Sequence, residues 1–244
     1  MEHLVFSTHR SVLSIQLNRM DKKNAITPEM YQGLTRALEE CQSNDEVHVV
    51  LLRGHTDCFT AGSDLQVLSA LDEQDLQAIK NFLNTLAAFP KPVVAAVGGA
   101  CVGIGVTLLM HCDLVVAADN AFFKMPFIDL ALCPEFASSL LLPKAMGYHK
   151  AAEHLMLGTS FTAEQAYQYC LVNQVVAPEI LLATADKMAT DLSQKPQQAL
   201  LHTKALLKYP LFSKISEQIQ EELAHFEACL ETEEAQGRIR KLVG

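Results

Sequence analysis

Short apolar runs alternate with segments of helical periodicity over the first two thirds of the chain. Two segments, residues 28–41 and 72–89, place apolar side chains three and four positions apart, which predicts amphipathic helices. Thr27 and Pro28 form a typical helix start, and Pro90 ends the second helix. Apolar runs typical of strands occupy residues 4–7, 12–17, 47–52, 92–97, 114–118 and 121–124. The alternation predicts an α/β core, and the first two runs predict a hairpin.

Helical periodicity dominates from residue 138 onward, with one strand expected at residues 172–176. Three closing helices are predicted at residues 197–207, 215–230 and 233–243. We therefore expect a core of residues 1–190 and a C-terminal helical region of residues 191–244, both within the same structural unit. The segment from residue 140 to residue 157 carries more apolar residues than a monomer easily hides, which indicates contact between copies of the chain.

Composition places the chain among ordinary globular enzymes. Of its 244 residues, 50% are hydrophobic and 19% are charged, and the formal net charge is -9. A negative balance disfavours a nucleic-acid partner, because such proteins usually present a basic face. The N-terminal residues lack the pattern of a signal peptide, and glycines interrupt the apolar run at residues 93–110, which disfavours a membrane span. We expect a soluble, cytoplasmic protein that binds neither nucleic acid nor membrane.

Cysteine and histidine usage indicates no metal site. The seven cysteines include no Cys-x-x-Cys pair, and a reducing compartment fits them best. Cys101, Cys112 and Cys133 lie in apolar runs, as expected of small buried residues. His111 has no second ligand or acid–base partner at a suitable spacing, so we interpret it as a core or partly buried histidine.

Two glycine-containing turns follow strand patterns. Residues 59–65 come after the strand that ends near Gly54, and residues 98–105 come after the strand at 92–97. A rigid strand followed by backbone with small side chains can aim free N–H groups at a ligand. Tight packing of a strand on a helix would explain the second turn as well, and Asp64 could simply cap a helix that starts at Leu65.

The run Gly103-Ile104-Gly105 resembles the start of a dinucleotide-binding fingerprint. That fingerprint needs a third Gly or Ala where this chain has Leu108, and an acidic residue roughly 20 positions further on. Because neither is convincing, we reject a nucleotide cofactor.

Glu135 is a carboxylate among apolar neighbours, and it has two interpretations. It could stabilise the start of a helix just after Pro134, in which case its pKa would be ordinary and low. It could instead be a catalytic base in an apolar pocket, in which case burial would raise its pKa.

In this order and spacing, the motifs resemble the crotonase (enoyl-CoA hydratase/isomerase) superfamily over essentially the whole chain. The matching segments are Asn18-Arg19, Asn24-Ala25, 59–65, 91–105, 112–114, Gly158 and 162–176. The resemblance implies a ββα-spiral core and C-terminal helices that form a homotrimer, often paired as a dimer of trimers. It also implies an acyl-CoA substrate, with coenzyme A as part of the substrate and no separate cofactor.

The resemblance implies roles for the two turns. The backbone N–H groups of Ser63 and Ile104 would form an oxyanion hole for a thioester carbonyl, although Ile104 is bulkier than the glycine common at that position. Lys22 is a further basic candidate for the CoA phosphates. The residues expected to bind substrate or CoA are Arg19, Lys23, Ala25, Ala61, Gly62, Asp64, Leu65, Gly103 and Phe127.

Within this superfamily, the position of the acid–base carboxylate distinguishes the reactions. Enoyl-CoA hydratases carry two glutamates at positions that become Thr107 and Phe127 here, so hydration by the usual pair is disfavoured. Glu135 matches the single glutamate of peroxisomal-type Δ3,Δ2-enoyl-CoA isomerases, within the run Pro126-Phe127, Pro134-Glu135 and Ser138-Ser139. The resemblance thus implies an isomerase of fatty-acid β-oxidation that converts 3-enoyl-CoA to trans-2-enoyl-CoA.

Two alternatives stay open at this point. One is another crotonase-type reaction, namely enoyl-CoA hydration or thioester hydrolysis, to which Asp64 or Asp129 would contribute. The other is a non-catalytic acyl-CoA-binding module, which the intact Glu135 disfavours.

Overall fold

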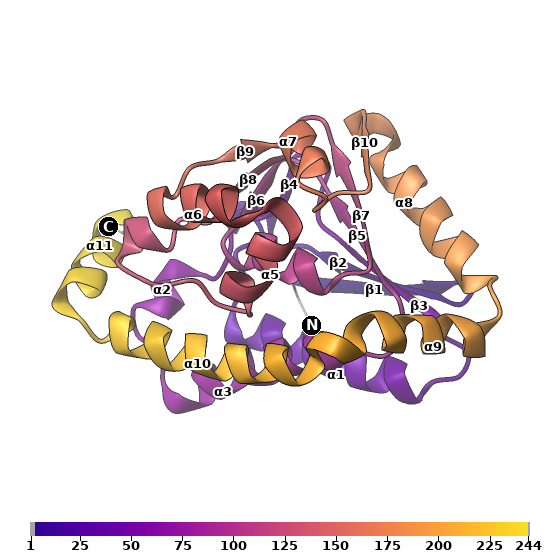
Figure 1. The fold of residues 1–244 in the computed structure, drawn as a ribbon, viewed down its shortest axis with the longest axis horizontal. Coiled ribbons are helices and arrows are strands. Elements are labelled where there is room, and N and C mark those ends of the chain that lie inside the picture. Colours follow the sequence, from indigo (N-terminus) through magenta and orange to yellow (C-terminus); the bar gives the residue numbers. More distant parts are fainter. Residues whose placement is uncertain (1–2, 244) are drawn as a thin grey trace.

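The computed structural model of the protein describes residues 3–243, and its chain opens with a hairpin (Figure 1). Strands β1 (Leu4–His9) and β2 (Val12–Leu17) pair antiparallel, with Leu4 opposite Leu17. Arg10 and Ser11 connect them at φ angles of 49° and 59°. Two consecutive residues with positive φ are typical of the two-residue turn that matches the twist of the strands. The predicted hairpin is therefore confirmed, with a shorter connection than expected.

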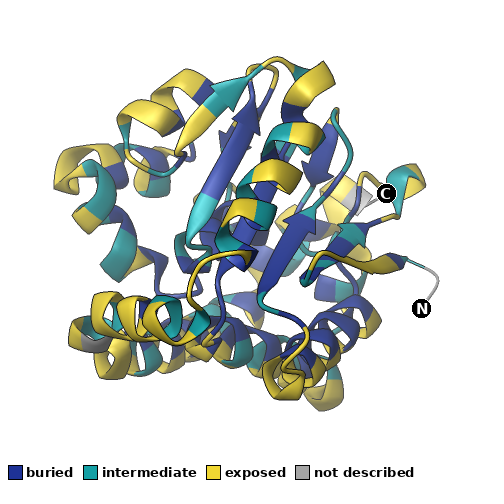
Figure 2. Cartoon of the chain, turned by 90° about the vertical axis from the view of Figure 1, so that its right-hand side faces the viewer, coloured by how far each residue is buried: buried dark blue, intermediate teal, exposed yellow. Residues whose placement is uncertain are grey.

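The first sheet has six strands in the order β1-β2-β3-β5-β7-β10, and all neighbours after the hairpin pair in parallel. Its remaining members are β3 (Val49–Arg53), β5 (Val93–Val97), β7 (Leu114–Ala118) and β10 (Gln174–Val176). Figure 2 shows these central strands in the colour of buried residues, with exposed residues on the surrounding helices. Burial on both faces explains why β3, β5 and β7 read as continuous apolar runs in the sequence.

Helices cover both faces of the first sheet. On one face, β-strand side chains such as Val50 join the main core, which includes residues of α1 (Pro28–Ser43) and α3 (Glu73–Ala88). On the other face, Leu51 and Val94 pack in a cluster with Leu181 and Ala185 of α8 (Pro178–Ser193). Successive strand residues thus point to opposite cores, as the two-residue period of a strand requires.

A second, smaller sheet has the order β4-β6-β8-β9. Its strands are β4 (Cys58–Thr60), β6 (Ala100–Val102), β8 (Phe122–Lys124) and β9 (Phe161–Thr162). The chain enters this sheet three times directly after a strand of the first sheet, from β3 to β4, from β5 to β6 and from β7 to β8, and each time a helix follows. This repeated strand–strand–helix unit is the expected ββα spiral, so the predicted α/β fold is confirmed.

Glycine allows the crossing from the first sheet to the second between β5 and β6. A Cβ atom at residue 98 would lie 2.3 Å from the Thr56 carbonyl oxygen, and one at residue 99 would lie 1.7 Å from the Asp57 carbonyl oxygen. Gly99 also has a φ of 56°, a conformation that glycine adopts without steric cost. The two crossings, 54–57 and 98–99, therefore touch through their backbones, and this contact brings β4 and β6 side by side.

The remaining helices are short in the middle of the chain and long near its end. They are α2 (Leu65–Leu68), α4 (Ile104–Thr107), α5 (Ser138–Met146), α6 (Tyr148–Leu157), α7 (Ala163–Gln168), α9 (Gln197–Lys208), α10 (Phe212–Leu230) and α11 (Glu233–Val243). Single 3-10 turns form η1 (Met20–Lys22), η2 (Leu108–His111), η3 (Ile128–Leu130) and η4 (Tyr209–Leu211). In Figure 1, α10 runs beside α3 along the lower edge of the molecule. No helix among residues 3–243 combines the length and the apolar character needed to cross a bilayer.

A buried lysine ties the C-terminal helices to the core. Lys204 of α9 donates to the Lys91 carbonyl oxygen at 2.6 Å and to the Asp113 carboxylate at 2.7 Å. Asp113 also accepts a hydrogen bond from the Val93 amide at 2.8 Å, so the ion pair anchors α9 beside the start of β5. The predicted closing helices are present, and the second begins at Phe212 rather than at residue 215.

Candidate active site

A cavity of about 870 Å³ lies where the turns after β4 and β6 meet the Glu135 segment and the C-terminal helices. Eight of the residues predicted from the sequence line it: Ala61, Gly62, Ser63, Leu65, Gly103, Ile104, Phe127 and Glu135. Side chains from α1, α3, α10 and α11 complete the wall, among them Tyr31, Ile79, Leu223 and Lys241. The cavity therefore combines segments that are far apart in the sequence.

The two glycine turns touch each other at the cavity wall. Gly62 has a φ of 96°, and a Cβ atom there would lie 3.0 Å from the Val102 carbonyl oxygen and 3.8 Å from the Gly103 Cα. The turns follow the parallel neighbours β4 and β6, not the longer strands β3 and β5 that the sequence suggested. Among the described residues, neither the Ser63 amide nor the Ile104 amide donates to another protein atom. Both N–H groups are thus free to meet a ligand.

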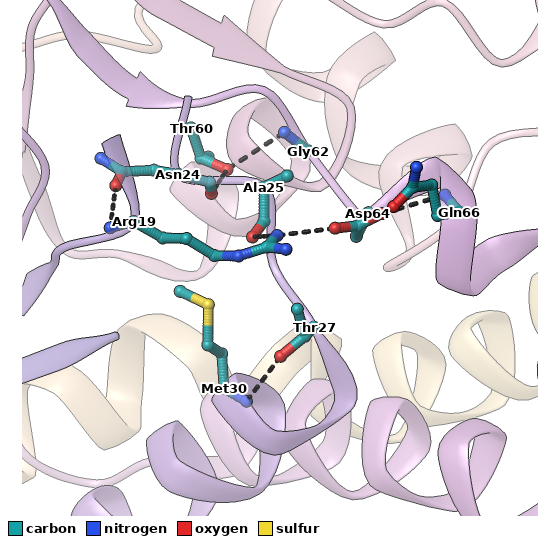
Figure 3. A network of polar contacts seen from close by, with 9 residues as sticks. All are labelled: Arg19, Asn24, Ala25, Thr27, Met30, Thr60, Gly62, Asp64 and Gln66. Carbon is teal, nitrogen blue, oxygen red and sulfur yellow. Dashed lines mark hydrogen bonds and ion pairs between the residues drawn. The ribbon is translucent and has the colours of Figure 1, made fainter. Parts of the chain in front are cut away.

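A network of hydrogen bonds holds the backbone of the first glycine turn, residues 59–65 (Figure 3). Asn24 accepts a hydrogen bond from the Arg19 amide at 2.7 Å and donates to the Phe59 carbonyl oxygen at 3.1 Å. The Thr60 hydroxyl donates to the Asn24 carbonyl oxygen at 2.7 Å and accepts from the Gly62 amide at 3.0 Å. The loop around Asn24 therefore holds the backbone on both sides of the turn.

Arg19 and Asp64 belong to this network rather than to the cavity wall. The Arg19 guanidinium donates to Asp64 at 2.6 Å and to the Ala25 carbonyl oxygen at 3.0 Å, and the Arg19 side chain is only 14% exposed. Asp64 also accepts from the Gln66 amide at 2.9 Å and caps α2, as the alternative interpretation of Asp64 suggested. Burial opposes ionisation of Asp64, but these hydrogen bonds keep its pKa below the ordinary value.

The predicted CoA-binding residues thus divide into two groups. Ala61, Gly62, Leu65, Gly103 and Phe127 line the cavity. Arg19, Lys23, Ala25 and Asp64 are not among its lining residues. Lys23 has a φ of 50°, and its carbonyl oxygen accepts from the Ala61 amide at 2.9 Å, so its backbone supports the first turn while its side chain is exposed.

Glu135 presents a buried carboxylate to the cavity. The residue is 7% exposed, and its Oε1 accepts a hydrogen bond from the Thr107 hydroxyl at 2.5 Å. Burial raises the pKa of Glu135 to about 8; the Thr107 bond opposes this rise, and the negative charge of Glu222 adds to it. The interpretation of Glu135 as an ordinary helix-start residue is therefore wrong, because α5 begins three positions later at Ser138.

The backbone after Glu135 adopts an uncommon conformation. Phe136 and Ala137 both have positive φ, at 63° and 55°, in the left-handed region that non-glycine residues rarely occupy. The Nε2 atom of His111 lies 2.9 Å from the Phe136 carbonyl oxygen, and the two rings stack with their centroids 3.9 Å apart. Burial lowers the pKa of His111 to about 3, so this core histidine is neutral and donates through Nε2.

Sequence reasoning missed two polar residues of the site, Tyr31 and Thr107. The Tyr31 hydroxyl lies 2.8 Å from the Ser63 hydroxyl, and burial raises the pKa of Tyr31, so the phenol stays neutral. The sequence signal for Tyr31 is its position beside Met30, on the apolar face of a predicted helix. In the sequence, Thr107 marks only the position of a missing glutamate, whereas in the structure it is the hydrogen-bond partner of Glu135.

Charged residues surround the cavity entrance. Lys124 pairs with Asp129 at 2.9 Å, and Arg238 of α11 pairs with Glu234 at 2.9 Å. Arg238 also donates to the Asp129 carbonyl oxygen at 3.2 Å, which joins α11 to η3. Within residues 3–243, no group of His, Cys, Asp and Glu side chains could hold a metal ion.

Comparison with known proteins identifies the family. The family model described as enoyl-CoA hydratase/isomerase matches residues 7–241, nearly the full length. The chain belongs to the enoyl-CoA hydratase/isomerase family. The solved structure of OdaA from Pseudomonas aeruginosa superposes on it with a TM-score of 0.96 and 39% sequence identity, covering 99% of each chain.

Family members with different activities resemble the chain to similar extents. Enoyl-CoA delta isomerase 2 of Rattus norvegicus is 38% identical over 179 residues, which are 70% of this chain and 46% of that relative. The chain thus matches about half the length of this isomerase. The 1,2-epoxyphenylacetyl-CoA isomerase of Escherichia coli is 34% identical over 204 residues, which are 80% of this chain and 78% of that relative. Membership of the family therefore establishes that the protein is an acyl-CoA-processing enzyme.

Proposed function

We propose that the protein isomerises 3-enoyl-CoA to trans-2-enoyl-CoA, with Glu135 as its only acid–base group. The observation that carries this proposal is the pairing of one buried carboxylate with two free backbone amides in one cavity. Among the described residues that line the cavity, Glu135 is the only buried carboxylate, since Asp129, Glu233 and Glu234 lie exposed at the entrance. One carboxylate is enough for a reaction that removes and returns one proton.

The proposed reaction balances without a cofactor. Ionised Glu135 takes the proton from C2, and the electron pair of the C2–H bond forms a dienolate on the thioester. The Ser63 and Ile104 amides would stabilise the oxygen charge, which is worth roughly 3 kcal/mol for each such donor. Glu135 then returns the proton to C4, so that the double bond lies between C2 and C3 and the carboxylate is restored.

The surroundings of Glu135 favour this reaction over the addition of water. The positions of the two glutamates of enoyl-CoA hydratases hold Thr107 and Phe127, and neither side chain can act as a base. Phe127, Leu130 and Leu132 are buried in the same wall, and apolar groups there limit access of water to the dienolate. The similarity to an enoyl-CoA delta isomerase is consistent with this choice.

The remaining parts of the expected function are proposals of the same kind. We propose a homotrimer or a dimer of trimers, because α6 and α9 expose large apolar side chains. These are Tyr148, Met156, Leu157, Leu206 and Leu207. Coenzyme A would enter at the charged entrance and follow the two turns as part of the substrate. We also propose a cytoplasmic location and a role in β-oxidation.

A substrate panel tests the reaction. Purified protein is assayed with trans-3-hexenoyl-CoA for isomerisation, with crotonyl-CoA for hydration and with both thioesters for hydrolysis. We expect isomerisation to dominate, Glu135→Gln to lose at least about a thousandfold in kcat, and the control Asp129→Asn to retain most of it. Faster hydration or hydrolysis by the wild-type protein, or an active Glu135→Gln variant, would contradict the proposal. Acyl-CoA binding without any turnover would point to the non-catalytic module.

A further inference from the structure

A second buried carboxylate lies behind the Glu135 turn, and the reaction proposed above does not use it. Glu222 belongs to α10 and is 5% exposed. Its Oε1 accepts hydrogen bonds from the Ser139 amide at 2.9 Å and from the Ser139 hydroxyl at 2.5 Å. Among the described residues, its Oε2 is buried without a hydrogen-bond partner. A buried carboxylate that is only half satisfied is costly, so its retention needs an explanation.

Glu222 supplies the cap that α5 lacks in its own sequence. The side chains of Thr27, Asp72 and Thr162 cap α1, α3 and α7 locally, but Ala137 before α5 has no polar side chain. Glu222 takes this place from a helix 83 residues further along the chain, at the positive end of the α5 dipole. A cap of this kind stabilises the first turn of the helix.

The cap is connected directly to the proposed acid–base group. Only Phe136 and Ala137 separate Glu135 from α5, and both are fully buried residues in left-handed conformation. This conformation is unfavourable for residues other than glycine, so contacts from outside must hold the turn. His111 holds it at the Phe136 carbonyl oxygen, and Glu222 holds it at the first turn of α5.

The same residue places a negative charge near Glu135. Burial raises the pKa of Glu222, while the hydrogen bonds from the Ser139 hydroxyl and amide oppose the rise. Among residues 3–243, no cation forms an ion pair with Glu222, and Lys80 of the neighbouring α3 pairs with Glu227 at 2.6 Å. Cys133 donates to the Glu222 carbonyl oxygen, and Tyr31 on the α1 side is neutral. The negative charge of Glu222 is therefore one of the causes that raise the pKa of Glu135.

We infer that Glu222 is a positioning residue: from α10 it caps α5 through Ser139 and so holds the turn that carries Glu135. As a second buried carboxylate at this turn, it also adds negative charge to the surroundings of Glu135. The inference rests on the proposed function for the identity of the acid–base group. Its two components, capping and charge, can be separated because glutamine keeps a hydrogen-bond acceptor without the charge, whereas alanine removes both.

Titration tests the charge without any assay of activity. Carboxyl carbon resonances of the labelled wild-type protein are followed against pH, and the spectrum of Glu135→Gln assigns Glu135 by difference. In Glu222→Gln we expect the Glu135 midpoint at lower pH than in the wild type. Glu221→Gln, the same change at the exposed neighbouring position, should leave it unchanged. Equal midpoints in Glu222→Gln and Glu221→Gln would overturn the inference.

Kinetics test the positioning. We expect Glu222→Ala to lose about tenfold or more in kcat with KM changed less than about twofold, and Glu222→Gln to keep kcat while the ascending limb of kcat against pH moves to lower pH. Wild-type kcat in Glu222→Ala, or an equal loss in Glu222→Gln, would overturn the positioning role. If Glu222→Ala does not fold, Glu222→Gln and the titration still decide. If the wild-type protein isomerises no 3-enoyl-CoA, the proposed function fails, while the Glu135 midpoint still tests Glu222.

Discussion

The hydroxyl of Thr107 donates to the carboxylate of Glu135 over 2.5 Å. This bond joins the end of α4, which begins with the second glycine turn, to the segment that carries the proposed acid–base group. A hydroxyl donor favours the ionised carboxylate, so Thr107 partly offsets the effect of burial on Glu135. The bond therefore sets both where the carboxylate lies and the pH at which it can accept a proton.

Removing this hydroxyl should shift the pH dependence of the reaction. In Thr107→Val the pKa of Glu135 should rise further, so the ascending limb of kcat/KM against pH moves to higher pH. We expect a loss of about tenfold at neutral pH, because a hydrogen bond to a charged group contributes about 1.5–3 kcal/mol. Thr107→Ser keeps the hydroxyl and serves as the control. Identical limbs in the valine and serine variants would refute this role of the bond.

The raised pKa of Glu135 also predicts how stability depends on pH. Between the ordinary value of 4.5 and the native value of about 8, the unfolded chain has released a proton that the folded chain keeps. Folding stability due to this group therefore falls as pH rises through that window. Glu135→Gln has no such proton, so its stability relative to the wild type should increase by up to about 5 kcal/mol across the window.

Chemical denaturation of both proteins near the two ends of this window measures the difference. Glu221→Gln is the control, since it makes the same substitution at an exposed position of α10. A constant difference between Glu135→Gln and the wild type would show that Glu135 has an ordinary pKa in the folded protein.

The contact between the glycine turns should be sensitive to a single methyl group. In Gly62→Ala the new Cβ would lie 3.0 Å from the Val102 carbonyl oxygen and push the two turns apart. We expect kcat to fall about tenfold to a hundredfold as one amide leaves its place. Gly147→Ala is the matched control, because Gly147 also has a positive φ, 78°, but no atom within 4 Å of its Cβ. Equal kcat in the two variants would exclude an effect specific to the turns.

The hydrogen bond between Tyr31 and Ser63 should couple α1 to the first turn. A double-mutant cycle of Tyr31→Phe and Ser63→Ala measures this coupling in the activation free energy. We expect an interaction of about 1 kcal/mol, because each single change removes the same hydrogen bond. Additive effects of the two changes would mean that the bond has no influence on the backbone amide of Ser63.

Length and burial decide which strands the sequence reveals. The strands β3, β5 and β7 are five residues long and buried on both faces, so their apolar runs are conspicuous. The strands β4 and β6 are three residues long, too short to show a period, and we interpreted them as parts of turns. Their pairing depends on the Gly98–Gly99 crossing against residues 56–57, which is a contact between segments far apart in the chain.

The site shows the same division between local and distant signals. The apolar neighbours of Glu135 were enough to suggest a raised pKa, because burial is its largest cause. The basic character of Arg19 suggested phosphate binding, whereas its partner Asp64 lies 45 residues away and takes up the guanidinium. The hydrogen bonds of Thr107 and Glu222 likewise join distant segments, and no pattern in the neighbouring residues predicts them.

The bond between Glu222 and Ser139 has a consequence for the order in which the protein is completed during synthesis. Chains emerge from the ribosome at about 5–20 residues per second, so several seconds separate the appearance of Ser139 from that of Glu222. During this interval the sheets can form, but α5 has no cap and the left-handed turn before it has no support from α10. The nascent chain would therefore acquire its cavity in outline first, and the proposed acid–base carboxylate of Glu135 would settle only when the last helices dock.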